Sequence, residues 1–310
     1  MNHSPATDRA AGGTDVVERT ELITSGPAQA LAGLLGVPLP DLDHGAPLPL
    51  LWHWVYLLDR PPQAVLGEDG HPAAGGIPSP PGPGRRRMFA GGRVTRRGPL
   101  RTGSAATRRT WEVSSTEKHG RSGRLVFVTV RSEISQGGRV VVTEEQDIVY
   151  RDAAGPPAGP PGGPPDGQSA GPAPPAEPAG PPVPPPVLVP GRAAGVAEWP
   201  VEVSTVLLFR FSALTYNGHR IHYDRDFARD IEGYPGLVVH GPLQALLMAE
   251  LARRTAPRPL SCEFTYRLVS PLFEGQGLIV SAAERDGASH TAVRDCAGRQ
   301  TATGALCAAP

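Results

Sequence analysis

The sequence contains little lysine, little cysteine and no net charge. Its 30 basic residues balance 30 acidic ones, and Lys118 is the only lysine. A neutral chain without a basic tail is not expected to bind nucleic acid, because that binding depends on neutralising phosphate groups. The three cysteines, Cys262, Cys296 and Cys307, form no CxxC pair. They predict no disulfide framework, and we therefore expect a protein of the reducing cytoplasm.

Long apolar runs are missing as well. No run approaches the ~20 residues that a membrane-spanning helix needs. The N-terminal stretch MNHSPATDRAAGGTDVVERT has acidic residues where a secretory signal would have an apolar segment. We therefore expect neither a secretory signal nor a membrane partner.

Glycine and proline are abundant, with 38 and 37 residues. The excess is concentrated in residues 151–190, which hold 16 prolines and 7 glycines. Because proline donates no backbone hydrogen bond and large apolar side chains are almost absent, this segment cannot form a core. It is either an extended linker or a disordered insertion. The chain then divides into a domain at 15–150, this segment, and a second domain at 191–308.

The rest of the sequence predicts an α+β protein in which one order of elements occurs twice. In the first domain we expect a helix at 15–36, a buried helix at 47–59, and strands at 85–95, 107–117, 124–135 and 139–151, the last two joined by a hairpin. In the second domain we expect a strand at 201–213, a helix at 241–254, and strands at 261–269, 276–284, 289–295 and 299–307. Each domain would then pack a helix on an antiparallel sheet.

Residues with useful chemistry are concentrated in 211–243, FSALTYNGHRIHYDRDFARDIEGYPGLVVHGPL. This segment holds His219, His222 and His240, and histidine is the usual side chain for proton transfer near neutral pH. Gly241 opens a predicted helix whose first N–H groups have no partner within the helix and favour a developing negative charge. The segment is therefore either a site that stabilises an oxyanion or a loop of structural histidines. The spacing does not favour a metal site, and we expect no metal or other cofactor.

The run FSALTYNGHRIHYD resembles the hydratase motif of MaoC-like proteins and (R)-specific enoyl-CoA hydratases, F-[AS]-x-L-[ST]-x-D-x-N-P-x-H-x-D, and GLVVHGPL resembles the segment that begins their central helix. The stretches LGEDGHP, RRRMFAGGRV and EEQDIVYR are similar to the N-terminal domain of one subfamily. That subfamily contains 3-methylfumaryl-CoA hydratase, itaconyl-CoA hydratase and 3-hydroxyacyl-thioester dehydratase. The resemblance implies two hot-dog folds in one chain and an acyl-thioester substrate that enters between them.

The resemblance also implies roles for single residues. His222 matches the catalytic histidine, and Gly241 matches the glycine whose N–H binds the thioester oxygen. Asn217 stands where the motif has its catalytic aspartate, His219 where it has asparagine, and Arg220 where it has proline. Because asparagine does not titrate, we expect His222 to be the main acid or base and Asn217 to orient the water. His219 would be a second proton-transfer group or a brace for the loop.

Four residues are predicted to contact the substrate: Arg210, Arg220, Tyr216 and Arg86. Guanidinium groups suit a substrate carboxylate or the phosphates of CoA. Other polar residues have structural interpretations. We expect Asp224 to act as a turn or cap residue, His240 to pack at the helix start, and Glu250 to pair with one of the two arginines that follow it.

These residues predict a hydro-lyase that reversibly hydrates an enoyl-CoA or dehydrates a 3-hydroxyacyl thioester. The resemblance favours a branched dicarboxylyl-CoA such as 3-methylfumaryl-CoA or itaconyl-CoA. Two alternatives stay open. One is a non-catalytic acyl-CoA-binding subunit, because Asn217 departs from the motif, and the other is a thioesterase of the same fold. The acyl chain, the direction of reaction, the choice between CoA and acyl-carrier protein, and a homodimer also stay open.

Overall fold

The computed structural model describes residues 15–80, 85–120, 123–152, 195–256 and 259–309, together with short strands at 7–8 and 189–190. The strands are β1 (Thr7–Asp8), β2 (Val16–Leu22), β3 (Arg85–Arg96), β4 (Ala105–Gly120), β5 (Gly123–Gln136), β6 (Arg139–Asp152), β7 (Val189–Pro190), β8 (Val196–Val201), β9 (Cys262–Leu268), β10 (Leu278–Arg285), β11 (Ala288–Arg294) and β12 (Gln300–Ala308). The α-helices are α1 (Ser25–Leu35), α2 (Thr205–Leu214) and α3 (Gly241–Thr255). Short helical turns are η1 (Leu42–His44), η2 (Trp52–Val55), η3 (Gln63–Val65), η4 (Arg220–His222) and η5 (Phe227–Ile231).

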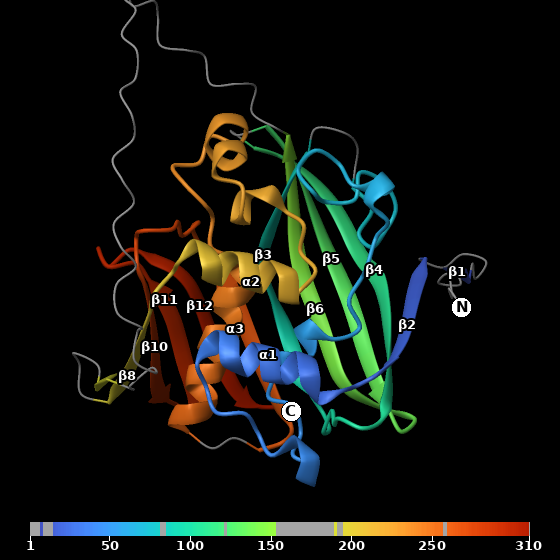
Figure 1. Cartoon of the computed structure of the whole chain (residues 1–310), viewed down its shortest axis with the longest axis vertical. Helices are drawn as coiled ribbons and strands as arrows, with labels where there is room; N and C mark the ends of the chain where they lie inside the picture. The colour runs from blue at the N-terminus through green and yellow to red at the C-terminus, as the bar shows by residue number, and fades with distance from the viewer. Residues whose placement is uncertain are drawn as a thin grey trace, which may run out of the picture.

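The described strands form one antiparallel sheet in the order β1-β2-β4-β5-β6-β3-β9-β12-β11-β10-β8-β7. Counted along the chain, β2–β6 and β8–β12 both follow the spatial order first, third, fourth, fifth, second. The two sets, called here the N-terminal and C-terminal halves, meet where β3 pairs with β9. In Figure 1 the sheet curves around the three α-helices. The α+β class and the repeated order of elements are confirmed.

The C-terminal half is built around α3, which the sequence predicted almost to the residue. Every side chain from Leu243 to Ala252 is buried, and the helix lies against β8–β12 and β3. Its last turn holds Arg253 and Arg254, whose charges suit the negative end of a helix. Arg253 forms the predicted ion pair with the buried Glu250.

The helix predicted at 15–36 is wrong over its first part. Val16–Leu22 forms strand β2, which is half-buried at alternate positions and pairs with β4. Helix α1 starts only at Ser25, with Pro27 in its first turn, where a backbone N–H is not needed. It ends at Gly36, which takes the left-handed conformation.

The strand predicted at 201–213 is a helix instead. Strand β8 ends at Val201, and α2 begins after Ser204, whose hydroxyl accepts a hydrogen bond from Leu207 N at 3.1 Å. Leu208 and Phe211 are buried and lie three residues apart, which is a helical spacing. The high apolar content of this segment favours a strand, but it does not decide between a strand and a buried helix.

The segment predicted as a buried helix at 47–59 is buried but mostly irregular. Only Trp52–Val55 forms a short 3-10 helix, and Leu51 and Leu57 have positive φ values that an α-helix excludes. The Tyr56 hydroxyl donates to Thr24 O at 2.7 Å and so joins this segment to the start of α1.

The other predicted strands are confirmed with small shifts at their ends, including the hairpin between β5 and β6. Most of the proline-rich segment at 151–190 lies outside the described residues. Among the described residues, no helix has the length and apolar character that crossing a bilayer requires.

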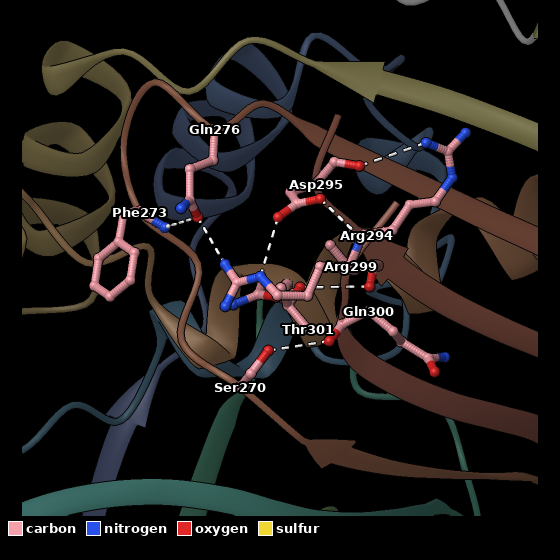
Figure 2. Close-up of polar contacts among 10 residues, drawn as sticks. Ser270, Phe273, Gln276, Arg294, Asp295, Arg299, Gln300 and Thr301 are labelled. Atoms are coloured by element: carbon pink, nitrogen blue, oxygen red, sulfur yellow. Dashed lines mark hydrogen bonds and ion pairs between the residues drawn. The ribbon is translucent and has the colours of Figure 1, made fainter. Parts of the chain in front are cut away.

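A polar network at one end of the C-terminal half holds the loop between β9 and β10 (Figure 2). Asp295 accepts hydrogen bonds from the backbone N and Nε of Arg299 at 2.8 and 3.1 Å, and Arg299 Nη2 donates to Gln276 at 2.8 Å. The same loop binds the segment before α3, because Val239 N donates to Leu272 O at 2.8 Å. The network therefore fixes the chain that leads into Gly241.

Candidate active site

His222 lies in η4, on the loop that follows α2, and is buried. Its Nδ1 lies 2.7 Å from Val238 O. Because a carbonyl oxygen only accepts, Nδ1 carries the proton and Nε2 keeps its lone pair. Burial lowers the pKa of His222 to about 4, although the bond to Val238 opposes this shift. His222 is therefore a neutral base whose tautomer is fixed by the backbone.

His240 stacks on His222, with ring centroids 3.7 Å apart, and is completely buried. Its Nε2 lies 2.8 Å from the Ser212 hydroxyl of α2. Burial lowers the pKa of His240 well below the usual value, and the neighbouring His222 lowers it further. His240 directly precedes α3, so it packs at the helix start as predicted.

His219 and Asn217 complete this loop. The His219 ring meets His222 edge-on, with ring centroids 5.4 Å apart. Burial lowers the pKa of His219 strongly, and the neighbouring His71 and His222 lower it further. The Asn217 side-chain oxygen accepts a hydrogen bond from the His219 backbone N at 3.0 Å. The structure thus brings His219 and His222 together and gives Asn217 a defined role in holding the loop.

Gly241 is the first residue of α3 and lies at the contact between the two halves. A Cβ atom at this position would lie 3.1 Å from Phe89 Cδ1 of β3 and 3.2 Å from Leu268 Cγ of β9. Only a glycine fits without moving these side chains. Its N–H, like the others of the first turn, has no partner within the helix.

Asp69 and His71 come from the N-terminal half and were not predicted as site residues. The His71 and His219 ring centroids are 4.2 Å apart, and His71 Nδ1 lies 3.2 Å from Asp69 Oδ2. Donor atoms of Asp69, His71 and His219 all lie within 4.8 Å of one another, close enough for one small ion or one water to touch all three. Their string, EDGH, lies about 150 residues before the histidine loop, so only the fold reveals the contact.

Two of the predicted substrate contacts already hold protein carboxylates. Arg220 binds Asp224 with Nε at 3.0 Å and Nη2 at 2.8 Å, and Arg86 Nε lies 2.7 Å from Glu232. Asp224 also accepts from Phe227 N at 3.0 Å, which confirms its structural role.

The other two predicted contacts lie on or just after α2. Arg210 is exposed, and Tyr216 is 54% exposed with a positive φ. Neither is part of the buried histidine cluster. Their roles in binding stay predictions.

A chain that repeats one five-stranded antiparallel unit, and joins the two units edge to edge around its helices, has the architecture of a double hot-dog fold. A MaoC-like dehydratase from Phytophthora capsici matches with a TM-score of 0.63 at 16% identity, over 95% of this chain and 96% of that one. A Mycobacterium tuberculosis protein described as a double hotdog fold matches with a TM-score of 0.54 at 17% identity, over 94% of each chain. The predicted double hot-dog fold is confirmed.

The family model of hydroxyacyl-thioester dehydratase type 2 matches residues 51–179 and 180–274. Mesaconyl-C(4)-CoA hydratase of Chloroflexus aurantiacus is 45% identical over 252 residues, which cover 77% of this chain and 74% of that protein. The chain belongs to the hydroxyacyl-thioester dehydratase type 2 family and is a hydro-lyase.

Proposed function

We propose that this hydro-lyase reversibly adds water to a branched, unsaturated dicarboxylyl-CoA of the mesaconyl type. The observation that carries the proposal is the 45% identity to mesaconyl-C(4)-CoA hydratase over 252 residues. A mesaconyl group that is bound to CoA through one carboxyl keeps the other as a free carboxylate. The site then needs proton-transfer groups, a donor for the thioester oxygen and a positive charge.

His222 is the proposed base for the attacking water. Its unprotonated Nε2 accepts a proton as the water oxygen bonds to the β-carbon, and the resulting imidazolium keeps its Nδ1 bond to Val238 O, 2.7 Å away. Asn217 orients the water through its amide group. His219 stays neutral, because burial lowers the pKa of its imidazole strongly, and braces the loop between His222 and the N-terminal half.

Gly241 is the proposed oxyanion donor. Its N–H opens α3, where the aligned peptide dipoles favour negative charge. As water adds, charge develops on the thioester oxygen, and a fixed backbone donor stabilises that charge more than it stabilises the substrate.

Arg87 is the arginine that we propose for the free carboxylate. It lies on β3, half-buried, opposite Tyr150 of β6. Burial is the main reason that the pKa values of His71 and His219 are lowered, and the charge of Arg87 contributes to both shifts. Among the described residues, Arg87 forms no ion pair with a carboxylate, whereas Arg86 and Arg220 do. Arg86, Arg210, Arg220 and Tyr216 then bind the CoA part or hold the loops that surround it.

A substrate panel tests this proposal. The wild-type enzyme is given mesaconyl-C(4)-CoA and crotonyl-CoA, which lacks the second carboxylate, and the loss of enoyl absorbance is followed together with the release of free thiol. We expect hydration of the mesaconyl thioester to be the faster reaction, without thiol release. Preference for crotonyl-CoA would overturn the substrate class, and thiol release would favour a thioesterase.

Two variants, assayed with the same two substrates, test the role of Arg87. Replacing Arg87→Met removes the positive charge and is expected to raise KM for the mesaconyl thioester by about 10- to 100-fold, the size of a charged hydrogen bond. KM for crotonyl-CoA is expected to change little. Arg93→Met on the same strand is the control, because Arg93 is mostly exposed and lies 3.9 Å from Glu145. An equal loss for both substrates would contradict the role of Arg87.

The proposal includes the cellular location and the domain division. We place the enzyme in the cytoplasm, where the exposed Cys296 would stay a free thiol. We keep the division into domains at 15–150 and 191–308.

We also propose a homodimer. It is supported by α2, on which Val206 and Phe209 are 62% and 60% exposed. Light scattering of the purified protein measures its oligomeric state directly.

A further inference from the structure

The histidine loop, residues 215–226 between α2 and η5, has no carboxylate left free of protein partners. Asn217 stands at the position where the hydratase motif has aspartate, and an amide does not take up a proton. Asp224 accepts from Arg220 and from Phe227 N, and Asp226 pairs with Arg229 at 3.1 Å. These two acids on the loop are therefore engaged in holding it. A second proton-transfer group has to come from another element.

Asp69 and His71 reach the loop from the N-terminal half. Asp69 Oδ1 accepts from the His71 backbone N at 2.9 Å, and Oδ2 lies 3.2 Å from His71 Nδ1. The carboxylate therefore fixes both the backbone and the ring of the histidine. With Nδ1 turned to Asp69, Nε2 is the nitrogen left for proton transfer. A carboxylate behind a histidine is also the usual way to stabilise its imidazolium form.

The loop that carries Asp69 and His71 packs tightly against the loop that carries Gly218 and His219. A Cβ atom on Gly70 would lie 1.9 Å from Gly218 O, so these backbones touch where any other residue would collide. Arg220 N donates to Asp69 O at 2.9 Å, and Arg220 Nη1 donates to Glu68 O at 3.1 Å. Backbone bonds and a glycine contact therefore hold His71 against His219 at the edge of the site.

We propose that His71, with Asp69 behind it, is the second proton-transfer residue of the active site and replaces the aspartate that Asn217 has lost. The proposal rests on the hydration reaction proposed above. It makes the site a composite of both halves, because His222 is contributed by one and His71 by the other. His71 is then a catalytic residue, and Asp69 is a positioning residue that acts through it.

The proton steps balance over one turnover. One O–H bond of water breaks, its proton goes to His222 Nε2, and the oxygen bonds to the β-carbon. The imidazolium of His71 gives its Nε2 proton to the α-carbon, and the negative charge of Asp69 balances the imidazolium before this transfer. His222 then releases its proton to solvent and His71 takes one up. The net change is one added water, and dehydration is the reverse.

The experiment compares variants with the wild-type enzyme on any enoyl-CoA that the wild-type hydrates. It therefore remains decisive if the mesaconyl type proves to be the wrong substrate. His71→Ala is expected to lower kcat by about 10²- to 10⁴-fold, as for other lost acid–base groups. Added imidazole is expected to restore part of that loss. Asp69→Asn should lower kcat less, with little change in KM. The control is Glu68→Gln, because Glu68 is exposed and directly precedes Asp69.

The outcomes are distinct. Rescue by imidazole, with a melting temperature close to that of the wild-type, supports proton transfer, because a packing defect is not repaired by a free base. Near-normal kcat in both His71→Ala and His71→Gln overturns the proposal. A loss that imidazole does not restore, with a lowered melting temperature, shows a structural role and also overturns it. The proposal is also overturned if the purified protein contains stoichiometric metal and a chelator abolishes its activity. Asp69, His71 and His219 would then hold an ion.

Discussion

At the residue scale, one hydrogen bond to the backbone fixes the tautomer of His222. Val238 O, 2.7 Å from Nδ1, selects the tautomer in which Nε2 is free to accept a proton. Replacing His222→Ala removes that base, and we expect kcat to fall by about 10²- to 10⁴-fold. The loss of enoyl absorbance measures it. His44→Ala is the control, because the His44 side chain is 83% exposed and pairs with Asp41 at the surface. Near-normal hydration by His222→Ala would contradict the assignment.

The pH profile tests the same residue without mutation. An ordinary histidine base would lose activity as the pH falls through 6.5, whereas burial lowers the pKa of His222 to about 4. The base form is neutral, so it is present above this pKa and lost below it. We therefore expect the acidic limb of kcat/KM near pH 4. An acidic limb near 6.5 would contradict the burial of His222 in solution.

The alkaline limb of the kcat/KM profile is expected to report the titration of His71. Burial lowers its pKa below 6.5, Asp69 opposes that shift, and Arg87 adds to it. Because His71 acts as an acid in hydration, kcat/KM is expected to fall on the alkaline side, and this limb should be absent in His71→Gln. The titratable and charged groups that face the His71 ring are Asp69, Arg87 and His219. An unchanged alkaline limb in the variant would argue against His71.

The site residues on one loop could be predicted from the sequence, because a motif needs only short spacing. His219 and His222 do lie together, and Gly241 directly follows His240, which stacks on His222. His71 and Asp69 could not be found in this way, since contacts between two loops far apart in the sequence bring them to His219. The ion pairs of Arg86 with Glu232 and of Arg220 with Asp224 were likewise hidden. A guanidinium group looks free in a sequence until its partner is known.

At the scale of elements, the loop that carries Asp69 and His71 depends on one glycine contact. Gly70→Ala would place a Cβ 1.9 Å from Gly218 O, so one of the loops has to move. We expect kcat/KM to fall at least about tenfold, since small displacements of reacting groups are costly. Gly75→Ala is a matched control, because Gly75 also has a positive φ but nothing within 4 Å. Equal effects of the two variants would show that backbone strain alone is responsible.

The elements themselves were predicted unevenly, and the reasons are physical. Helix α3 and the strands β3–β6 and β9–β12 carry a clear pattern of apolar residues, and they were predicted; β2 was taken as part of a helix, and β8 was not predicted. The segment at 201–213 is apolar on several sides, because Val206 and Phe209 are exposed while Leu208 and Phe211 are buried. Its period was therefore unclear, and the capping hydroxyl of Ser204 was the better signal. At 47–59 burial was predicted correctly, but positive φ values at Leu51 and Leu57 break the helix.

At the scale of the whole molecule, strand pairing and side-chain contacts join the two halves. β3 pairs with β9, and Phe89 of the N-terminal half lies at the start of α3. Two polypeptides covering 1–170 and 171–310, produced together, are therefore expected to assemble and to retain hydration activity. Neither should be active alone, because His71 and His222 would be separated. Activity in the C-terminal piece alone would contradict the composite site.

The most direct measurement is a turnover of mesaconyl-C(4)-CoA by the wild-type enzyme in water that carries heavy oxygen, with the product analysed by mass spectrometry. We predict a product that has gained one water, contains one heavy oxygen atom and is still a CoA thioester. An unchanged enoyl thioester, or free CoA thiol with heavy oxygen in a released acid, would contradict the hydratase function proposed for this site.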